Sequence, residues 1–130
     1  MIVLDASAAL ELLLNTDGGR LVADRIRDPQ LTLHAPHLLS IEVAHVLRRL
    51  VATGEVRAAR ASLALDDLRA LDLDRYDHEL LLPRIWKLRD NLTAYDAAYV
   101  ALAEALGATL LTFDERLARA PGNRATIELL

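Results

Sequence analysis

The chain has 130 residues, which is enough for one folded domain with its own core and too few for two ordinary domains. Its hydrophobic fraction of 53% excludes intrinsic disorder, and the absence of cysteine excludes disulfides, zinc–thiolate sites and thiol nucleophiles. The net charge of −4 argues against a uniformly basic nucleic-acid-binding surface, although 15 Lys and Arg residues allow local basic patches.

Hydrophobic periodicity and turn residues predict strands that alternate with helices along the chain. The apolar run Ile2–Leu4 is expected to be a buried strand, and a helix opens at Asp5 and Ser7 and ends near Leu14. The sequence Asp17-Gly18-Gly19 is expected to break that helix. The elements that follow, in chain order, are a helix at about Arg20–Arg27, a strand at Leu31–Ala35, helices at His37–Ala52 and Glu55–Leu71, a short edge strand at Leu71–Tyr76, helices at His78–Arg89 (with Pro83 as a candidate kink) and Thr93–Leu106, a strand at Thr109–Phe113, a helix at Asp114–Arg119 and a strand at Ala125–Leu129. This alternation predicts an α/β fold with a parallel sheet in a single domain of residues 1–130.

The sequence carries no sign of a membrane span or a secretion signal. The apolar first residues lack a basic leader, and Asp5 and Glu11 interrupt them. No apolar run approaches the roughly 20 residues that a membrane-spanning helix needs. We therefore expect a soluble, cytoplasmic protein.

Asp5 and Asp114 occupy equivalent positions, each after a predicted strand and before a predicted helix. Aspartate there is a good helix N-cap, which explains either residue equally well when it is taken alone. Open parallel sheets, however, bind ligands beyond the carboxyl ends of their strands. If the two strands are neighbours, both carboxylates lie at one ligand site.

Asp96 and Glu42 add two further carboxylates. Asp96 stands three residues after Thr93, which is capping-box spacing, so a purely structural role explains it when it is taken alone. Glu42 lies inside a predicted helix, where capping cannot explain it, and its neighbours one turn away are leucine and valine. An ionised carboxylate on such a face must be paired, metal-bound or neutralised. The structural alternative is an ion pair with His45 or Arg49, and we favour the metal.

Four converging carboxylates indicate a hard divalent cation. Mg²⁺ and Mn²⁺ prefer oxygen ligands, and a cation relieves the repulsion between the carboxylates. Such a site suits phosphodiester cleavage, because the metal neutralises the phosphate and activates water without a protein nucleophile. The sequence does not distinguish one metal from two. It holds no glycine-rich phosphate loop, metalloprotease histidine spacing or nucleophile elbow.

Four segments also carry a family resemblance. They are Ile2–Ser7 (IVLDAS), Ser40–Val43 (SIEV), Leu92–Ala103 (LTAYDAAYVALA) and Leu110–Asp114 (LLTFD), and their placement covers nearly the whole chain. In these segments the sequence resembles the PIN-domain ribonucleases, particularly the VapC-type toxins of type II toxin–antitoxin systems. The resemblance implies a PIN-like parallel β-sheet flanked by α-helices.

The resemblance also implies a site and an activity. The acidic site would be formed by Asp5, Glu42, Asp96 and Asp114, with Thr112 in support. Ser7, one turn inside the expected pocket, is a second supporting candidate that would bind a metal-bound water or a phosphate, and its alternative is an ordinary serine at a helix start. Asp5 and Asp96 are the best candidates for direct metal ligands, while Glu42 and Asp114 would bind a second metal or orient water. Glu115 is an alternative to Asp114 for the fourth position. The implied activity is Mg²⁺- or Mn²⁺-dependent cleavage of RNA by a homodimer, which inhibits translation or growth until a cognate antitoxin, often bound to operator DNA, neutralises it.

Two other functions are compatible with an α/β domain that carries these acidic residues. A receiver-type signalling module would need an acidic neighbour beside Asp5 and a lysine after a late strand, whereas Lys87 lies in a predicted helix. A purely structural interaction module would use the three aspartates as helix caps and would place Glu42 in a salt bridge.

The arginines that we expect to be available for phosphate contacts are Arg48, Arg49, Arg84, Arg89 and Arg116.

Overall fold

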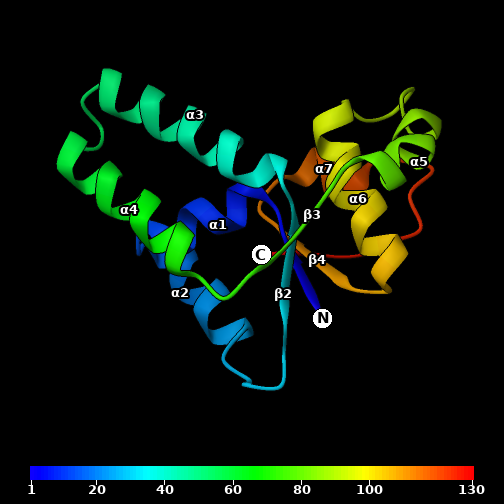
Figure 1. The fold of residues 1–130 in the computed structure, drawn as a ribbon, viewed down its shortest axis with the longest axis horizontal. Helices are drawn as coiled ribbons and strands as arrows, with labels where there is room; N and C mark the ends of the chain where they lie inside the picture. The colour runs from blue at the N-terminus through cyan, green and yellow to red at the C-terminus, as the bar shows by residue number, and fades with distance from the viewer.

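Five short strands form one parallel sheet in the computed structural model, which describes all residues 1–130 (Figure 1). The strands are β1 (Ile2–Leu4), β2 (Leu33–Pro36), β3 (Asp74–Tyr76), β4 (Thr109–Thr112) and β5 (Thr126–Leu129). Their spatial order is β3-β2-β1-β4-β5, and every neighbouring pair is parallel. The chain moves outward from β1 to β3 and then returns to the other side of β1 at β4. The strand order therefore reverses between β1 and β4, which is where sheets of this kind bind ligands.

Helices cover both faces of this sheet. They are α1 (Ala6–Leu13), α2 (Asp17–Arg25), α3 (Leu38–Ala52), α4 (Ala58–Ala70), the 3₁₀ helix η1 (Glu79–Leu81), α5 (Leu82–Lys87), α6 (Ala94–Leu106) and α7 (Glu115–Arg119). In Figure 1, α1–α4 lie to the left of the strands and α5–α7 to the right. None of the helices combines the length and the apolar character needed to cross a membrane.

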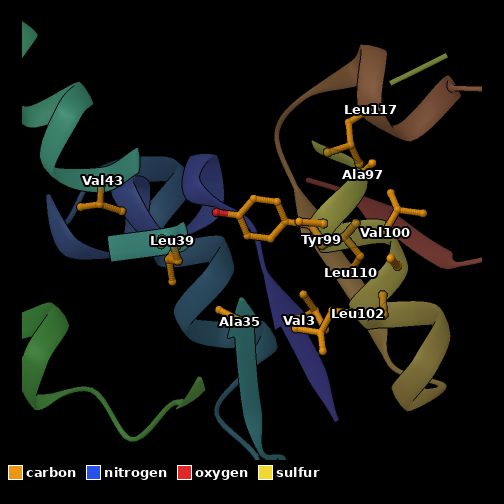
Figure 2. Packing of buried hydrophobic residues seen from close by; sticks show 14 of the residues in the cluster. Val3, Ala35, Leu39, Val43, Ala97, Tyr99, Val100, Leu102, Leu110 and Leu117 are labelled. Atoms are coloured by element: carbon orange, nitrogen blue, oxygen red, sulfur yellow. The ribbon is translucent and has the colours of Figure 1, made fainter. Parts of the chain in front are cut away.

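The core is built mainly on α6, in which all seven residues of 97–103 are buried. It continues through Val3 and Leu110 on the sheet and through Leu39 and Val43 of α3 (Figure 2). A second, smaller cluster lies on the other side of β1, where Ile2 and Leu4 pack with residues of α1 and α2. Because both faces of β1 are covered, all three of its residues are buried, as its uniformly apolar sequence predicted.

The predicted break at Asp17-Gly18-Gly19 is wrong, because these residues form the first turn of α2. The chain reverses instead at Asn15, whose φ of 53° lies in the left-handed region, and the Thr16 side chain caps α2 by accepting from the Gly19 N–H. Pro83 does not kink a helix interior, since it lies in the first turn of α5, where proline is well tolerated. The other predicted elements are present with shifted ends, and β3 is an edge strand as expected.

Candidate active site

The ends of β1 and β4 bring two of the predicted acids to the centre of the sheet. Leu4 pairs with Leu111, so the two strands end side by side. Each chain then turns into a helix, capped by Asp5 at α1 and by Asp114 at α7. Asp5 Oδ1 accepts from the Ala8 N–H at 2.9 Å, and Asp114 Oδ1 accepts from two N–H groups of α7 at 2.8 and 3.3 Å. Both residues are therefore caps, and both also lie at the edge where ligands bind.

Asp5 is the most deeply buried acid of the group, with 5% of its surface exposed. Ser7 Oγ donates to Asp5 Oδ1 at 2.7 Å, and Thr112 Oγ1 donates to Asp5 Oδ2 at 2.6 Å. Burial raises the pKa of Asp5, the hydrogen bonds from Thr112, Ala8 and Ser7 oppose that rise, and the negative charge of Asp96 adds to it. The two predicted supporting residues thus hold this carboxylate in place.

The same two hydroxyls connect Asp5 to the chain after β4. Thr112 Oγ1 accepts from the Asp114 N–H at 2.9 Å, and Ser7 Oγ accepts from the Phe113 N–H at 2.9 Å. Each hydroxyl therefore donates to Asp5 and accepts from the β4–α7 turn. This network fixes the two strand ends relative to each other and orders the backbone around both aspartates.

Glu42 projects from α3 and meets a residue that the sequence analysis missed. The Tyr99 hydroxyl of α6 donates to Glu42 Oε1 at 2.8 Å, and Glu42 makes no ion pair with His45 or Arg49. Burial raises the pKa of Glu42, the Tyr99 hydrogen bond lowers it, and the charges of Asp96 and Asp5 raise it further. The predicted ion-pair alternative is therefore absent from the structure.

Asp96 lies in the first turn of α6, where its N–H donates to Thr93 Oγ1 at 3.1 Å. Burial and then the charge of Asp114 raise the pKa of the Asp96 carboxyl, against the effects of Thr93 and Arg116. Asp96 in turn raises the pKa of both Asp5 and Glu42. The four predicted acids come from the ends of β1 and β4, from α3 and from α6. Asp96 connects them electrostatically, because the charge of Asp114 acts on Asp96 and the charge of Asp96 acts on Asp5 and Glu42.

This donor set fits a hard divalent cation such as Mg²⁺ or Mn²⁺. Glu42 Oε2 and Asp114 Oδ2 accept no hydrogen bond, and Asp5 Oδ2 accepts only one, so each of these oxygens retains lone pairs for an ion. Burial is the main cause of the raised pKa values of Asp5, Glu42 and Asp96, and repulsion from neighbouring carboxylates, which a cation would relieve, adds to it. As the side chains stand, no three acidic or histidine groups surround a single point directly. Because Mg²⁺ takes few carboxylates and keeps several waters, it suits such an open arrangement.

Residues 2–123 match the family model of the PIN domain. The chain belongs to the PIN-domain family. It is 49% identical to VapC ribonuclease Mb0985 of Mycobacterium bovis over 119 residues, which are 90% of this chain and 88% of that protein. It is also 43% identical to ribonuclease VapC1 of Mycobacterium tuberculosis over 129 residues, which are 98% of this chain and 96% of that protein.

The fold of this PIN domain is shared with a solved toxin–antitoxin structure. VapBC2 from Rickettsia felis, bound to a DNA fragment from the promoter of the pair, superposes with a TM-score of 0.73 at 15% identity, over 100% of this chain and 99% of the other. At that identity the likeness concerns the fold alone. It agrees with the predicted PIN-like sheet flanked by helices.

The remaining predicted residues of the PIN domain divide into those near the acids and those engaged elsewhere. Glu115 is exposed and pairs with Arg119 at 3.7 Å, whereas the Arg116 Nε lies 3.8 Å from Asp114 Oδ1. Arg84 pairs with Glu104 at 2.6 Å, so it is not free to contact phosphate. The Arg89 guanidinium stacks on Trp86 at 4.7 Å, and Arg48 and Arg49 are exposed on α3.

A hollow of about 420 Å³ opens beside Glu42 and is lined mainly by apolar side chains. Its lining comes from α3 and from the start of α6, where Tyr95 directly precedes Asp96. Of the four acids, Glu42 alone lines this hollow.

Proposed function

We propose that this PIN domain, residues 1–130, is a Mg²⁺- or Mn²⁺-dependent endoribonuclease that cleaves RNA phosphodiesters as the toxin of a type II toxin–antitoxin module. The observation that carries the proposal is the grouping of Asp5, Glu42, Asp96 and Asp114 at the strand-order reversal, in a chain 41–49% identical to VapC ribonucleases. Its action in the cytoplasm would inhibit translation or growth until the antitoxin binds.

The residues of the site have distinct roles in this proposal. Asp5 and Asp96 would bind the cation directly, and Glu42 and Asp114 would complete its surroundings or orient water. When bound, the cation supplies charge neutralisation at the scissile phosphate and activation of the attacking water. Ser7 and Thr112 orient Asp5 through their hydrogen bonds, and Arg116, whose Nε lies 3.8 Å from Asp114 Oδ1, would contact the RNA backbone.

The proposed partners are the RNA substrate, a cognate antitoxin, operator DNA reached only through that antitoxin, and a second copy of the chain. The Rickettsia felis neighbour pairs a VapC-fold chain with its partner on promoter DNA, which supports the antitoxin and DNA arms of the proposal. The homodimer is supported by large exposed hydrophobic side chains on α3, η1, α5 and α6, which a monomer would leave in water. They are Ile41, Leu80, Leu82, Trp86 and Tyr95. Sedimentation of the purified chain tests the dimer.

Cleavage of RNA by purified protein tests the proposed activity. We expect cleavage with Mg²⁺ or Mn²⁺ that EDTA abolishes, and a loss of about hundredfold or more in Asp5→Asn and Asp96→Asn. Asp66→Asn, an exposed site on α4, is the matched control and should cleave at the wild-type rate. Absence of metal-dependent cleavage by the wild type, or equal activity of all three variants, would contradict the proposal.

A further inference from the structure

Tyr99 is a buried tyrosine that the proposed chemistry does not use. Only 1% of its surface is exposed, and its ring is packed in the core against residues of α6, α3 and the sheet. Figure 2 shows the ring extending away from α6, with its hydroxyl directed toward the side of the molecule that holds α3. The hydroxyl makes one hydrogen bond, to Glu42 Oε1. The two groups thus connect α6 to α3 at the acidic site.

The position of Tyr99 on its helix relates it to a second site residue. It follows Asp96 by three residues, so both side chains project from the same side of α6. Asp96 carries a carboxylate toward the site, and Tyr99 carries a hydroxyl to a carboxylate of the neighbouring helix. One turn of α6 therefore sets the positions of two of the four acids.

Glu42 needs such a restraint. Its side chain is long and flexible, it lines the open hollow along α3, and the charges of Asp96 and Asp5 repel it. Without a hydrogen bond from inside the protein, rotation toward water would relieve that repulsion. The Tyr99 hydroxyl is the only protein group that donates to the Glu42 carboxylate, and the ring that carries it is held by core packing. The donor is thus fixed by packing, whereas the acceptor side chain has rotatable bonds that this hydrogen bond restrains.

We propose that Tyr99 is a positioning residue that holds Glu42 at the acidic site, and this inference rests on the proposed nuclease function. Tyr99 does not touch substrate, since its ring lies in the core. Its effect on RNA cleavage and on cation affinity passes through Glu42. A merely structural tyrosine would affect stability alone, because its hydroxyl would simply need a buried partner.

Tyr99→Phe removes the hydroxyl and keeps the packed ring. The matched control is Tyr76→Phe, because the Tyr76 hydroxyl also makes one hydrogen bond, at 2.8 Å to His34 Nδ1, with a residue outside the acidic site. We expect kcat for RNA cleavage to fall about tenfold to hundredfold in Tyr99→Phe with KM changed less than about threefold, the range found for residues that orient metal ligands. Tyr76→Phe should stay within about twofold of the wild type. Both are assayed at a temperature at which circular dichroism shows them fully folded.

A double-variant comparison separates positioning from general loss of structure. Glu42→Asp keeps the charge but shortens the side chain by one methylene, which withdraws the carboxylate from the Tyr99 hydroxyl. If Tyr99 acts through Glu42, adding Tyr99→Phe to Glu42→Asp should change kcat by less than about twofold. Equal loss from Tyr99→Phe in both backgrounds would overturn the inference.

The affinity for Mn²⁺, measured by titration calorimetry without RNA, is the readout that does not depend on activity. We expect it to fall about tenfold or more in Tyr99→Phe and to be unchanged in Tyr76→Phe. An active wild type whose Tyr99→Phe variant matches Tyr76→Phe in kcat and Mn²⁺ affinity would overturn the inference and leave the proposed function standing. A wild type that binds Mn²⁺ but cuts no RNA would defeat the proposed function, and the affinity comparison would still decide the role of Tyr99.

Discussion

The hydroxyl of Thr112 offers a direct test of the network that fixes the acidic site. Thr112 is fully buried, donates to Asp5 Oδ2 at 2.6 Å and accepts from the Asp114 N–H at 2.9 Å. Thr112→Val replaces that hydroxyl with a methyl group of similar size. It removes a hydrogen bond to a carboxylate, worth about 1.5–3 kcal/mol, and one from a backbone N–H, worth about 1 kcal/mol.

We therefore expect Thr112→Val to lower the free energy of unfolding by about 3 kcal/mol, measured by urea denaturation with an unchanged slope. Thr109→Val, at the start of the same strand, is the control, because the Thr109 side chain makes no hydrogen bond and should lose less than about 0.5 kcal/mol. RNA cleavage by Thr112→Val should also fall, since Asp5 loses its fixed orientation. Equal stability of the two variants would refute the view that Thr112 orders the strand ends.

Two further predictions concern the scaffold around the site. Gly19→Ala would place a Cβ 2.1 Å from the Glu11 carbonyl oxygen, so α1 and α2 would have to move apart. We expect the free energy of unfolding, measured by thermal melting, to fall by more than about 2 kcal/mol. A smaller loss would mean that the two helices separate easily. The pKa of Glu104 is lowered in the folded protein, chiefly by the hydrogen bond from Arg84. This pair therefore stabilises the fold fully at any pH above the ordinary glutamate pKa of 4.5. The stabilisation is lost as the pH falls through the lower pKa of the folded state. Unfolding free energies of the wild type and Glu104→Gln measured against pH should differ at pH 7 and converge in acid; a constant difference would contradict the assignment.

The parts of the site that follow from local sequence could be predicted. Asp5 and Asp114 each end a strand and begin a helix, and the alternation of strands and helices implied a parallel sheet in which such ends meet. Ser7 and Thr112 lie within two residues of these aspartates along the chain, so their supporting contacts were within reach of a family resemblance. The one step that local sequence left open was whether β1 and β4 are neighbours, and the structure shows that they are.

The contacts that sequence reasoning missed all depend on the packing of distant elements. The partner of Glu42 is Tyr99, 57 residues away on another helix, and helical periodicity indicates only that Tyr99 faces the core. Arg84 was expected to be available for phosphate, but the fold brings it to Glu104, 20 residues away.

The turn before α2 was also misassigned, for a different physical reason. Consecutive glycines usually mark a loop. Here the lack of a Cβ at Gly19 instead allows α2 to begin against the backbone of α1. A signal for this start exists in the sequence, since Thr16 is a good N-cap and Asp17 suits the first turn.

The central claim is that Asp5, Glu42, Asp96 and Asp114 form one cation site, and a Mn²⁺ titration followed by thermal melting tests it most directly. Saturating Mn²⁺ at about 100 times its dissociation constant should stabilise the wild type by about 2.7 kcal/mol, which raises the melting temperature by roughly 10 °C in a domain of this size. Asp96→Asn should lose most of that rise, while Asp66→Asn should keep it. A wild type that does not respond to Mn²⁺, or an Asp96→Asn variant that responds equally, would contradict the claim and favour a purely structural role for these carboxylates.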